Sequence, residues 1–112
     1  SPKRSISSKE GFKEIFSCPD QKFSTQNILV LSKENDLGFA RIGVAIKKKD
    51  TKLAVDRNNI KRKIKGSFIS KALELPCRDF VVYVKRNLKG KEEDLKKDLE
   101  KIWIKFNNKN GQ

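Results

Sequence analysis

The stretch that most limits how this chain can fold is AVDRNNIKRKIKGSF, residues 54–68, which holds five Lys and Arg side chains and one acid. Within it an apolar residue recurs at every fourth position, namely Ile60, Ile64 and Phe68. At about 3.6 residues per turn these positions form a single stripe, which predicts a helix over residues 57–71. Asp56 is expected to be its N-cap. Other elements must cover the stripe, so the rest of the chain has to supply a core.

The adjoining face of the same helix is cationic. Four polar residues fall together on it: Asn58, Lys61, Arg62 and Lys65. Arg57 lies near the boundary of this face, Asn59 adds a second amide, and Lys63 points elsewhere. Like charges four residues apart destabilise a helix by roughly 0.2–0.5 kcal/mol per pair. Binding to phosphates offsets that cost by releasing condensed counterions, so the face is predicted to bind a nucleic acid. The plainer alternative is a solvated basic surface.

The basic residues are concentrated in one part of the chain. The sequence has 27 Lys and Arg against 14 Asp and Glu, a formal net charge of +13. Residues 41–65 contain ten of the bases and two acids, whereas residues 92–112 contain five of each. Just before the basic helix stand three consecutive lysines, Lys47, Lys48 and Lys49. A charge this large and this local favours a polyanionic partner.

Apolar periodicity and β-branched residues predict five further elements. They are a helix over 7–16, strands over 27–32, 40–47 and 79–86, and a helix over 92–106. A chain of 112 residues is long enough for one modest core and too short for two. Residues 1–112 are therefore expected to form a single RNA-binding domain, with residues 107–112 as a flexible tail.

Several classes of protein are disfavoured by what the sequence lacks. It contains no His, and its two cysteines, Cys18 and Cys77, lie far apart. No metal site is therefore expected in the protein, and both thiols are expected to be free in a reducing cytoplasm. No apolar run approaches the roughly 20 residues that span a bilayer, and no secretory signal is expected. A self-sufficient nuclease needs clustered carboxylates or a His-type acid–base pair. The sequence points to no such carboxylate cluster and to no acid–base pair, so no catalytic residue is expected.

Three short motifs follow one another along the chain. The first helix ends in a Phe-x-x-Ile-Phe pattern, at Phe12, Ile15 and Phe16. A later strand contains Arg-Ile-Gly-Val, at Arg41, Ile42, Gly43 and Val44. The basic helix opens with a polar signature, at Arg57, Asn58, Asn59, Lys61, Arg62 and Lys65. In this order the motifs resemble the protein component of bacterial ribonuclease P.

The resemblance implies an α+β fold with an N-terminal helix, a central, mostly antiparallel sheet and a C-terminal helix. The basic helix is expected in an unusual left-handed βαβ crossover. The resemblance also implies that an RNA subunit removes the 5′ leader of precursor tRNA, using Mg²⁺ bound mainly by that RNA. The protein, monomeric without RNA, is expected to bind the RNA subunit through the signature residues and Lys47–Lys49.

The leader itself is expected in a cleft between the first helix and the sheet. By position, that cleft is expected to be lined by Phe12, Phe16, Ile28 and Val30. Aromatic faces suit single-stranded RNA, because base stacking contributes roughly 1–3 kcal/mol per base whatever the sequence. The alternative is that Phe12 and Phe16 are core residues that fix the first helix.

Two positions depart from the pattern of the family, and two rival functions stay open. Asn59 stands where a second Arg is expected, which weakens one phosphate contact or leaves it to Lys63. Gly66 stands where helix formers are common. The main rival is a structural RNA-binding protein such as a small ribosomal protein, because composition does not separate the two. A DNA-binding helix-turn-helix protein is less consistent, since strands flank the basic helix where that motif has a preceding helix.

Overall fold

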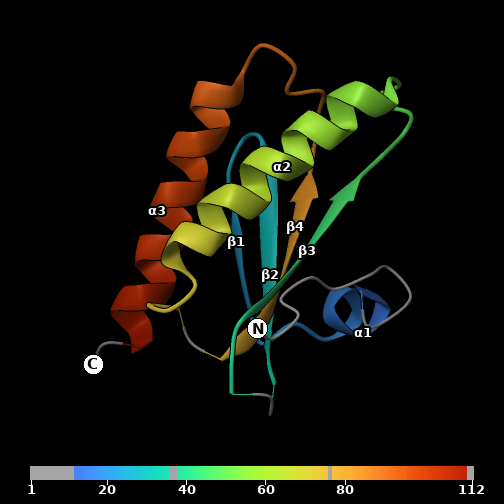
Figure 1. Ribbon diagram of the computed structural model, residues 1–112. Helices are drawn as coiled ribbons and strands as arrows, with labels where there is room; N and C mark the ends of the chain where they lie inside the picture. The colour runs from blue at the N-terminus through green and yellow to red at the C-terminus, as the bar shows by residue number, and fades with distance from the viewer. Residues whose placement is uncertain (1–11, 36–37, 76, 111–112) are drawn as a thin grey trace.

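The structure is a computed structural model that describes residues 12–35, 38–75 and 77–110, with side chains from residue 15 to residue 106 within those ranges. In chain order the elements are α1 (Phe12–Ser17), β1 (Gln21–Ser24), β2 (Ile28–Glu34), β3 (Arg41–Ile46), α2 (Ala54–Lys71), β4 (Arg78–Val84) and α3 (Glu92–Asn110). Figure 1 shows α2 and α3 together on one side of the sheet. No helix in these ranges is long and apolar enough to cross a membrane.

The four strands lie side by side in the order β1-β2-β4-β3. β1 pairs with β2, and β2 with β4, in antiparallel fashion, whereas β3 and β4 are parallel and are joined through α2. In Figure 1 α2 lies in front of the sheet while the chain passes from β3 on the right to β4 on its left, so this crossover is left-handed. Almost all βαβ crossovers are right-handed. The expected α+β fold is therefore confirmed, including its least common feature.

One face of the sheet is buried beneath α2 and α3. Side chains alternate between the two faces along a strand, and this face receives Ile28 and Val30 from β2, both 0% exposed. The predicted stripe of α2 packs on it, with Ile60, Ile64 and Phe68 all buried. From α3 it receives Leu95, Leu99, Ile102, Trp103 and Phe106. Burial of each large side chain contributes about 1.5–3 kcal/mol, so this layer fixes how α2 lies on the sheet.

Aromatic contacts join β4 to both covering helices. The ring centroid of Phe80 lies 4.8 Å from that of Phe106 and 5.7 Å from that of Trp103, both nearly perpendicular. Phe68 of α2 lies 6.1 Å from the same ring. Such edge-to-face pairs add about 0.5–1.5 kcal/mol beyond their burial. Trp103 Nε1 also donates a hydrogen bond to Ser67 Oγ at 3.0 Å, so the indole is satisfied inside the core.

Among the described elements, α1 covers part of the opposite face of the sheet. Ile15 of α1 is 2% exposed and packs against Leu31 and Val81. Leu29 and Ala45 pack against this small cluster and are only partly buried. We call this side of the sheet the open face.

The structure differs from the predicted elements by one missed strand and two helix boundaries. The strand β1 was not predicted, because its sequence QKFS has a single large apolar residue; in the structure it pairs with β2 over all four of its residues. α2 begins at Ala54, and Leu53 occupies the N-cap position without a side-chain cap. Asp56 therefore lies in the first turn, where its negative charge still interacts favourably with the helix dipole. α3 continues to Asn110, so residues 107–110, expected in a tail, are helical; residues 111–112 and 7–11 lie outside the described part of the chain.

Candidate nucleic-acid interface

The outer face of α2 brings four of the predicted residues together: Asn58, Lys61, Arg62 and Lys65. Successive residues are about 100° apart around a helix, so these four fall within an arc of about 100°. Asn58 and Arg62 are exposed, and Lys61 and Lys65 are partly buried at the edge of the core stripe. Within the described ranges none of the three cations forms an ion pair with a carboxylate. Their positive charge is therefore free to attract an anionic ligand.

Asn59 and Lys63 lie on the other flank of α2. Both line a groove of about 730 Å³ between α2 and α3, as does Arg62 of the outer face. The opposite wall of this groove carries Glu92, Glu93 and Glu100, together with Lys96. This flank is thus placed beside carboxylates, which reduces its attraction for phosphate. Lys63 does not lie with the outer face of α2.

Arg57 makes hydrogen bonds within the protein. Its Nη1 donates to the backbone oxygens of Thr51 at 2.8 Å and Lys52 at 2.9 Å. In the same loop, the backbone amides of Asp50 and Thr51 donate to the oxygen of Lys47 at 3.2 and 3.1 Å. Arg57 therefore fastens residues 47–53, which we call the basic loop, to the start of α2. Within that loop Lys48 and Lys49 are exposed.

The prediction that Ile28 and Val30 line a cleft beside the first helix was wrong. Both are 0% exposed and belong to the core beneath α2 and α3. The two residues were assigned to the wrong face of β2. Successive side chains point to opposite faces of a strand, so an assignment that is wrong by one residue exchanges the faces. Leu29, their neighbour on β2, lies on the open face instead.

The two phenylalanines predicted for the cleft differ in how far the structure describes them. Phe16 is 42% exposed, so it is not a core residue. The backbone of Phe12 is helical, but its side chain lies outside the described residues. Of the four residues predicted to line the cleft, Phe16 is thus the one with a described side chain available to a ligand on the open face.

Tyr83 on β4 was not predicted to contribute to this surface. It is partly exposed on the open face, and its ring meets the edge of Phe16 at a centroid distance of 6.2 Å. Lys47 Nζ lies 5.4 Å from the centre of the Tyr83 ring. The sequence contains a signal for this position. Val82 and Val84 face the core, and side chains alternate along a strand, so the only tyrosine of the chain lies on the opposite face.

Lys47 links the open face to the basic loop. A hydrogen bond with the Tyr83 side chain, and attraction to its phenolate when that group ionises, raise the pKa of Lys47 above its ordinary value of 10.5. The exposed ammonium group, charged at neutral pH in any case, thus lies beside an aromatic ring. A cation next to two accessible aromatic rings fits a flexible, single-stranded polyanion with exposed bases.

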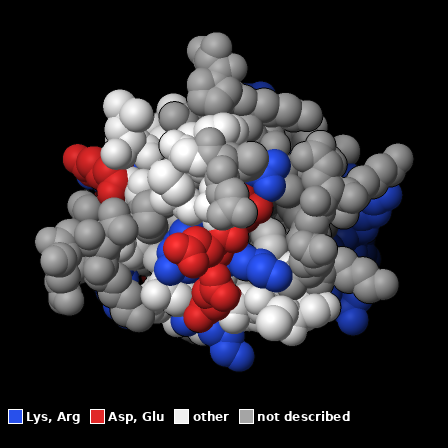
Figure 2. Space-filling view, turned by 90° about the horizontal axis from the view of Figure 1, so that it is seen from below, with Lys and Arg blue, Asp and Glu red and all other residues white. Residues whose placement is uncertain are grey.

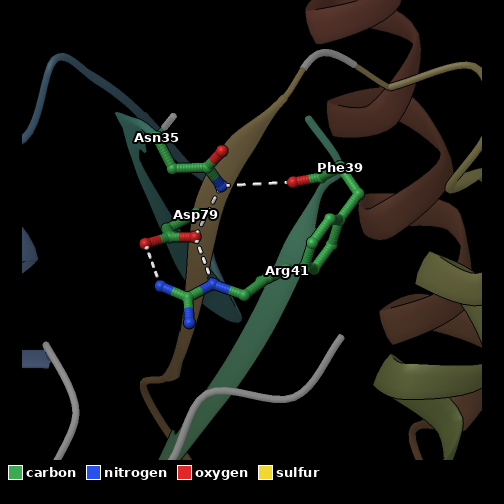
Figure 3. Close-up of polar contacts among 4 residues, drawn as sticks. All are labelled: Asn35, Phe39, Arg41 and Asp79. Carbon is green, nitrogen blue, oxygen red and sulfur yellow. Dashed lines mark hydrogen bonds and ion pairs between the residues drawn. The ribbon is translucent and has the colours of Figure 1, made fainter. Parts of the chain in front are cut away.

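The opposite end of the sheet has a different electrostatic character. Arg41 forms two hydrogen bonds with Asp79, at 2.8 and 2.7 Å, and Asn35 donates to the same carboxylate at 2.8 Å (Figure 3). The charge of Arg41, counted in the basic segment of the sequence, is thus neutralised by a neighbouring strand. Asp20 lies at this end as well, 3.6 Å from Arg78. Figure 2, seen from below, shows Asp and Glu side chains gathered near the centre of this surface.

Comparison with known proteins identifies the family. The family profile described as Ribonuclease P matches residues 1–107. The ribonuclease P protein component of Stutzerimonas stutzeri is 40% identical over 93 residues, covering 82% of this chain and 71% of that protein. The ribonuclease P protein component of Cronobacter sakazakii is 41% identical over 93 residues, covering 82% of this chain and 77% of that protein.

Solved structures agree on the fold. The Staphylococcus aureus RNase P protein superimposes with a TM-score of 0.79 at 21% identity, covering 93% of this chain and 94% of that chain. The RNase P protein from Thermotoga maritima gives a TM-score of 0.76 at 21% identity, covering 88% of this chain and 94% of that one. From the sequence matches, the chain belongs to the ribonuclease P protein family, the protein subunit of ribonuclease P.

Proposed function

We propose that this chain binds the RNA subunit of ribonuclease P through the outer face of α2 and the basic loop, and holds the 5′ leader of precursor tRNA on the open face of the sheet. In this assignment the RNA subunit performs the hydrolysis, with Mg²⁺ bound mainly by the RNA. The protein contributes affinity and position. It is expected to act in the cytoplasm and to be monomeric before it meets the RNA.

The observation that carries the first part is the unpaired cationic row on α2. Lys61, Arg62 and Lys65 share one flank and have no carboxylate partner in the described chain. Each phosphate that such a row neutralises releases counterions, which supplies affinity without sequence preference. Asn58, on the same flank, adds an amide that can both donate and accept hydrogen bonds.

Support for the second part comes from Phe16, Tyr83 and Lys47. Two aromatic rings meet edge to face on the open face, with an ammonium group 5.4 Å from one of them. Base stacking on such rings contributes roughly 1–3 kcal/mol per base and tolerates any sequence. That tolerance suits a leader, since leaders of different tRNA precursors need not share a sequence.

Reconstitution tests the proposal. Cleavage of a leader-bearing precursor tRNA is measured at low Mg²⁺ with the RNA subunit alone, with the protein alone, and with both. We expect the RNA subunit to cleave faster, or to bind the precursor more tightly, when the protein is added, and the protein alone to cleave nothing. A lack of any gain would contradict the proposal, and cleavage by the protein alone would contradict the division of labour.

A small ribosomal protein was the main rival function, and membership of the ribonuclease P protein family disfavours it. The same assay separates the two classes, because a ribosomal protein has no reason to accelerate removal of a leader. A ribosomal RNA fragment of equal length serves as the matched competitor. We expect it to displace the RNA subunit poorly at physiological salt.

A further inference from the structure

The two flanks of α3 differ in charge, although residues 92–112 contain equal numbers of acids and bases. The flank toward α2 carries Glu92, Glu93 and Glu100, which line the groove between the two helices. On another flank three exposed lysines recur at every fourth position: Lys97, Lys101 and Lys105. The charges of α3 are therefore unevenly arranged: among the described side chains, Lys96 is the one cation of α3 that lines the groove with the three glutamates, whereas the three lysines share their flank with Asp94 and Asp98. We call the three lysines the α3 lysine row.

Next to this row the surface is hollowed. A pocket of about 330 Å³ lies between the β1–β2 turn, the segment after β4, and α3. Four cations line it, Arg86, Lys91, Lys97 and Lys101, together with the side-chain amides of Gln26 and Asn27. We call it the turn pocket. In Figure 1 α3 lies at the left of the molecule, whereas α2 begins at the upper right.

Two carboxylates also line the turn pocket, and one of them is engaged by the turn. Asp98 Oδ2 accepts hydrogen bonds from Thr25 Oγ1 at 2.9 Å and from Asn27 Nδ2 at 3.0 Å. Neither Asp98 nor Asp94 forms an ion pair with the four cations in the described ranges. Four cations against two carboxylates leave the lining with a net charge of +2. The pocket is thus a fixed concavity that favours an anion.

The lysine row differs from the outer face of α2 in having acids beside it, because Asp94 and Asp98 stand three residues before Lys97 and Lys101. These acids offset the repulsion between lysines at i and i+4, so the case for a ligand rests on the excess of cations in the pocket and on the length of the row. From Lys97 to Lys105 the helix rises about 12 Å, at about 1.5 Å per residue. In B-DNA the phosphates of one strand are spaced by about 3.4 Å of axis, so a row of this length can contact several phosphates of a nucleic-acid strand and exceeds the size of a single small anion.

We propose that the turn pocket and the α3 lysine row form a second binding site for the phosphodiester backbone of RNA, separate from the outer face of α2. The inference rests on the proposed function for the identity of the RNA. Two RNAs offer such a phosphodiester backbone, namely the RNA subunit and the distal part of the leader, and the experiment below distinguishes them. The protein would then contact RNA on two sides, through α2 and through the basic flank of α3.

The test compares two neighbouring lysines of α3 that face different ways. Lys97→Gln removes a cation from the turn pocket, and a Lys97→Gln/Lys101→Gln double variant removes two. Lys96→Gln is the matched control, because Lys96 belongs to the flank with Glu92, Glu93 and Glu100. All three positions are exposed, so the variants are expected to fold, which thermal unfolding verifies.

Binding is measured against salt concentration in two arms. One arm uses protein and RNA subunit alone; the other uses the assembled holoenzyme with precursor tRNAs of short and long leader. Each lost phosphate contact should reduce the slope of log affinity against log salt by about 0.7–0.9. A reduced slope in the first arm assigns the site to the RNA subunit, and a loss confined to long leaders assigns it to the leader.

Slopes for both lysine variants equal to that of Lys96→Gln in both arms would overturn the second site. This outcome is distinct from failure of the proposed function, which appears as a lack of stimulation by the unchanged protein. If a lysine variant shows a smaller salt dependence of binding while the unchanged protein stimulates cleavage, both the second site and the proposed function are supported.

Discussion

Arg57 connects α2 to the basic loop before it. Its Nη1 bridges two backbone oxygens, those of Thr51 and Lys52, while the residue as a whole stays partly exposed. Thr51 is 0% exposed, so the loop is held against the fold and not merely extended into solvent. At this position one side chain therefore orders a neighbouring cationic segment and can still approach a phosphate.

Replacement of Arg57 by Ala should loosen the basic loop. Two hydrogen bonds from a charged donor are lost, and a bond of that kind contributes about 1.5–3 kcal/mol when well ordered; partial exposure puts the expected loss of stability at the lower end. Amide hydrogen exchange should accelerate over residues 47–53. Lys61→Ala removes the same charge without touching the loop, so accelerated exchange in that variant would contradict the role assigned to Arg57.

Tyr83 should matter for the leader and not for the body of the tRNA. Tyr83→Leu keeps an apolar side chain on the open face but removes the ring that meets Phe16 and Lys47. We expect the affinity of the holoenzyme for leader-bearing precursor to fall by roughly 1–3 kcal/mol, the contribution of one stacked base. Equal losses for precursor and mature tRNA would show that the substitution acts on the fold instead.

At the scale of elements, α2 has three distinct sides: a buried stripe, an outer cationic face, and a flank that shares a groove with acidic residues of α3. The first follows from apolar spacing. The difference between the other two depends on where α3 packs, because α3 places three glutamates in the groove that Asn59 and Lys63 line. Of the outer face, Arg62 also lines this groove, and Lys61 and Lys65 do not. The Lys and Arg side chains of α2 are therefore expected to contribute unequally to the affinity for RNA.

Lys61 and Lys63 make this inequality measurable. Lys61→Ala should reduce the salt slope for binding the RNA subunit by about 0.7–0.9, the value of one phosphate contact. Lys63→Ala removes the same charge from the flank toward α3 and should reduce the salt slope less. Equal slopes for the two variants would place the RNA across both flanks of α2.

Gly66 weakens α2 for no steric reason within the protein. A Cβ added there would meet nothing within 4 Å. Gly66→Ala should raise the free energy of unfolding by about 1 kcal/mol, the difference in helix propensity. Gly90→Ala is the contrasting control: Gly90 has a φ of +79°, so an added Cβ should cost about 1–2 kcal/mol. Urea unfolding followed by Trp103 fluorescence measures both changes. A destabilised Gly66→Ala variant would indicate an obstruction in the groove beside α3.

At the scale of the whole molecule, charge is distributed unevenly along the sheet. One end carries Asp20, Asp79 and the ion pairs that neutralise Arg41 and Arg78. The other end carries the basic loop, the start of α2 and the turn pocket. Because the charges at the first end are paired and those at the second are in excess, RNA is attracted mainly to the second end, so the protein has a preferred orientation toward a folded RNA before any close contact forms.

Much of the fold was predictable from local pattern. The stripe of Ile60, Ile64 and Phe68 fixed which side of α2 is buried, and β-branched runs located three of the four strands. β1 was not predictable in this way, since four residues with one large apolar side chain give too weak a period. The cleft residues were misplaced for a related reason: an apolar run such as ILVL does not reveal which alternate set faces the core.

The sequence by itself determined the composition of charge, the amphipathic helices and the family, because these depend on which residues stand at which spacing along one segment. Only the tertiary structure decided which strand face is open, that Arg41 is neutralised by Asp79, and that three glutamates of α3 face the groove beside α2 while Lys97 and Lys101 line a separate pocket. Those features arise from pairing between segments distant in the chain. No local period encodes them, since each depends on the position of a partner residue elsewhere in the fold.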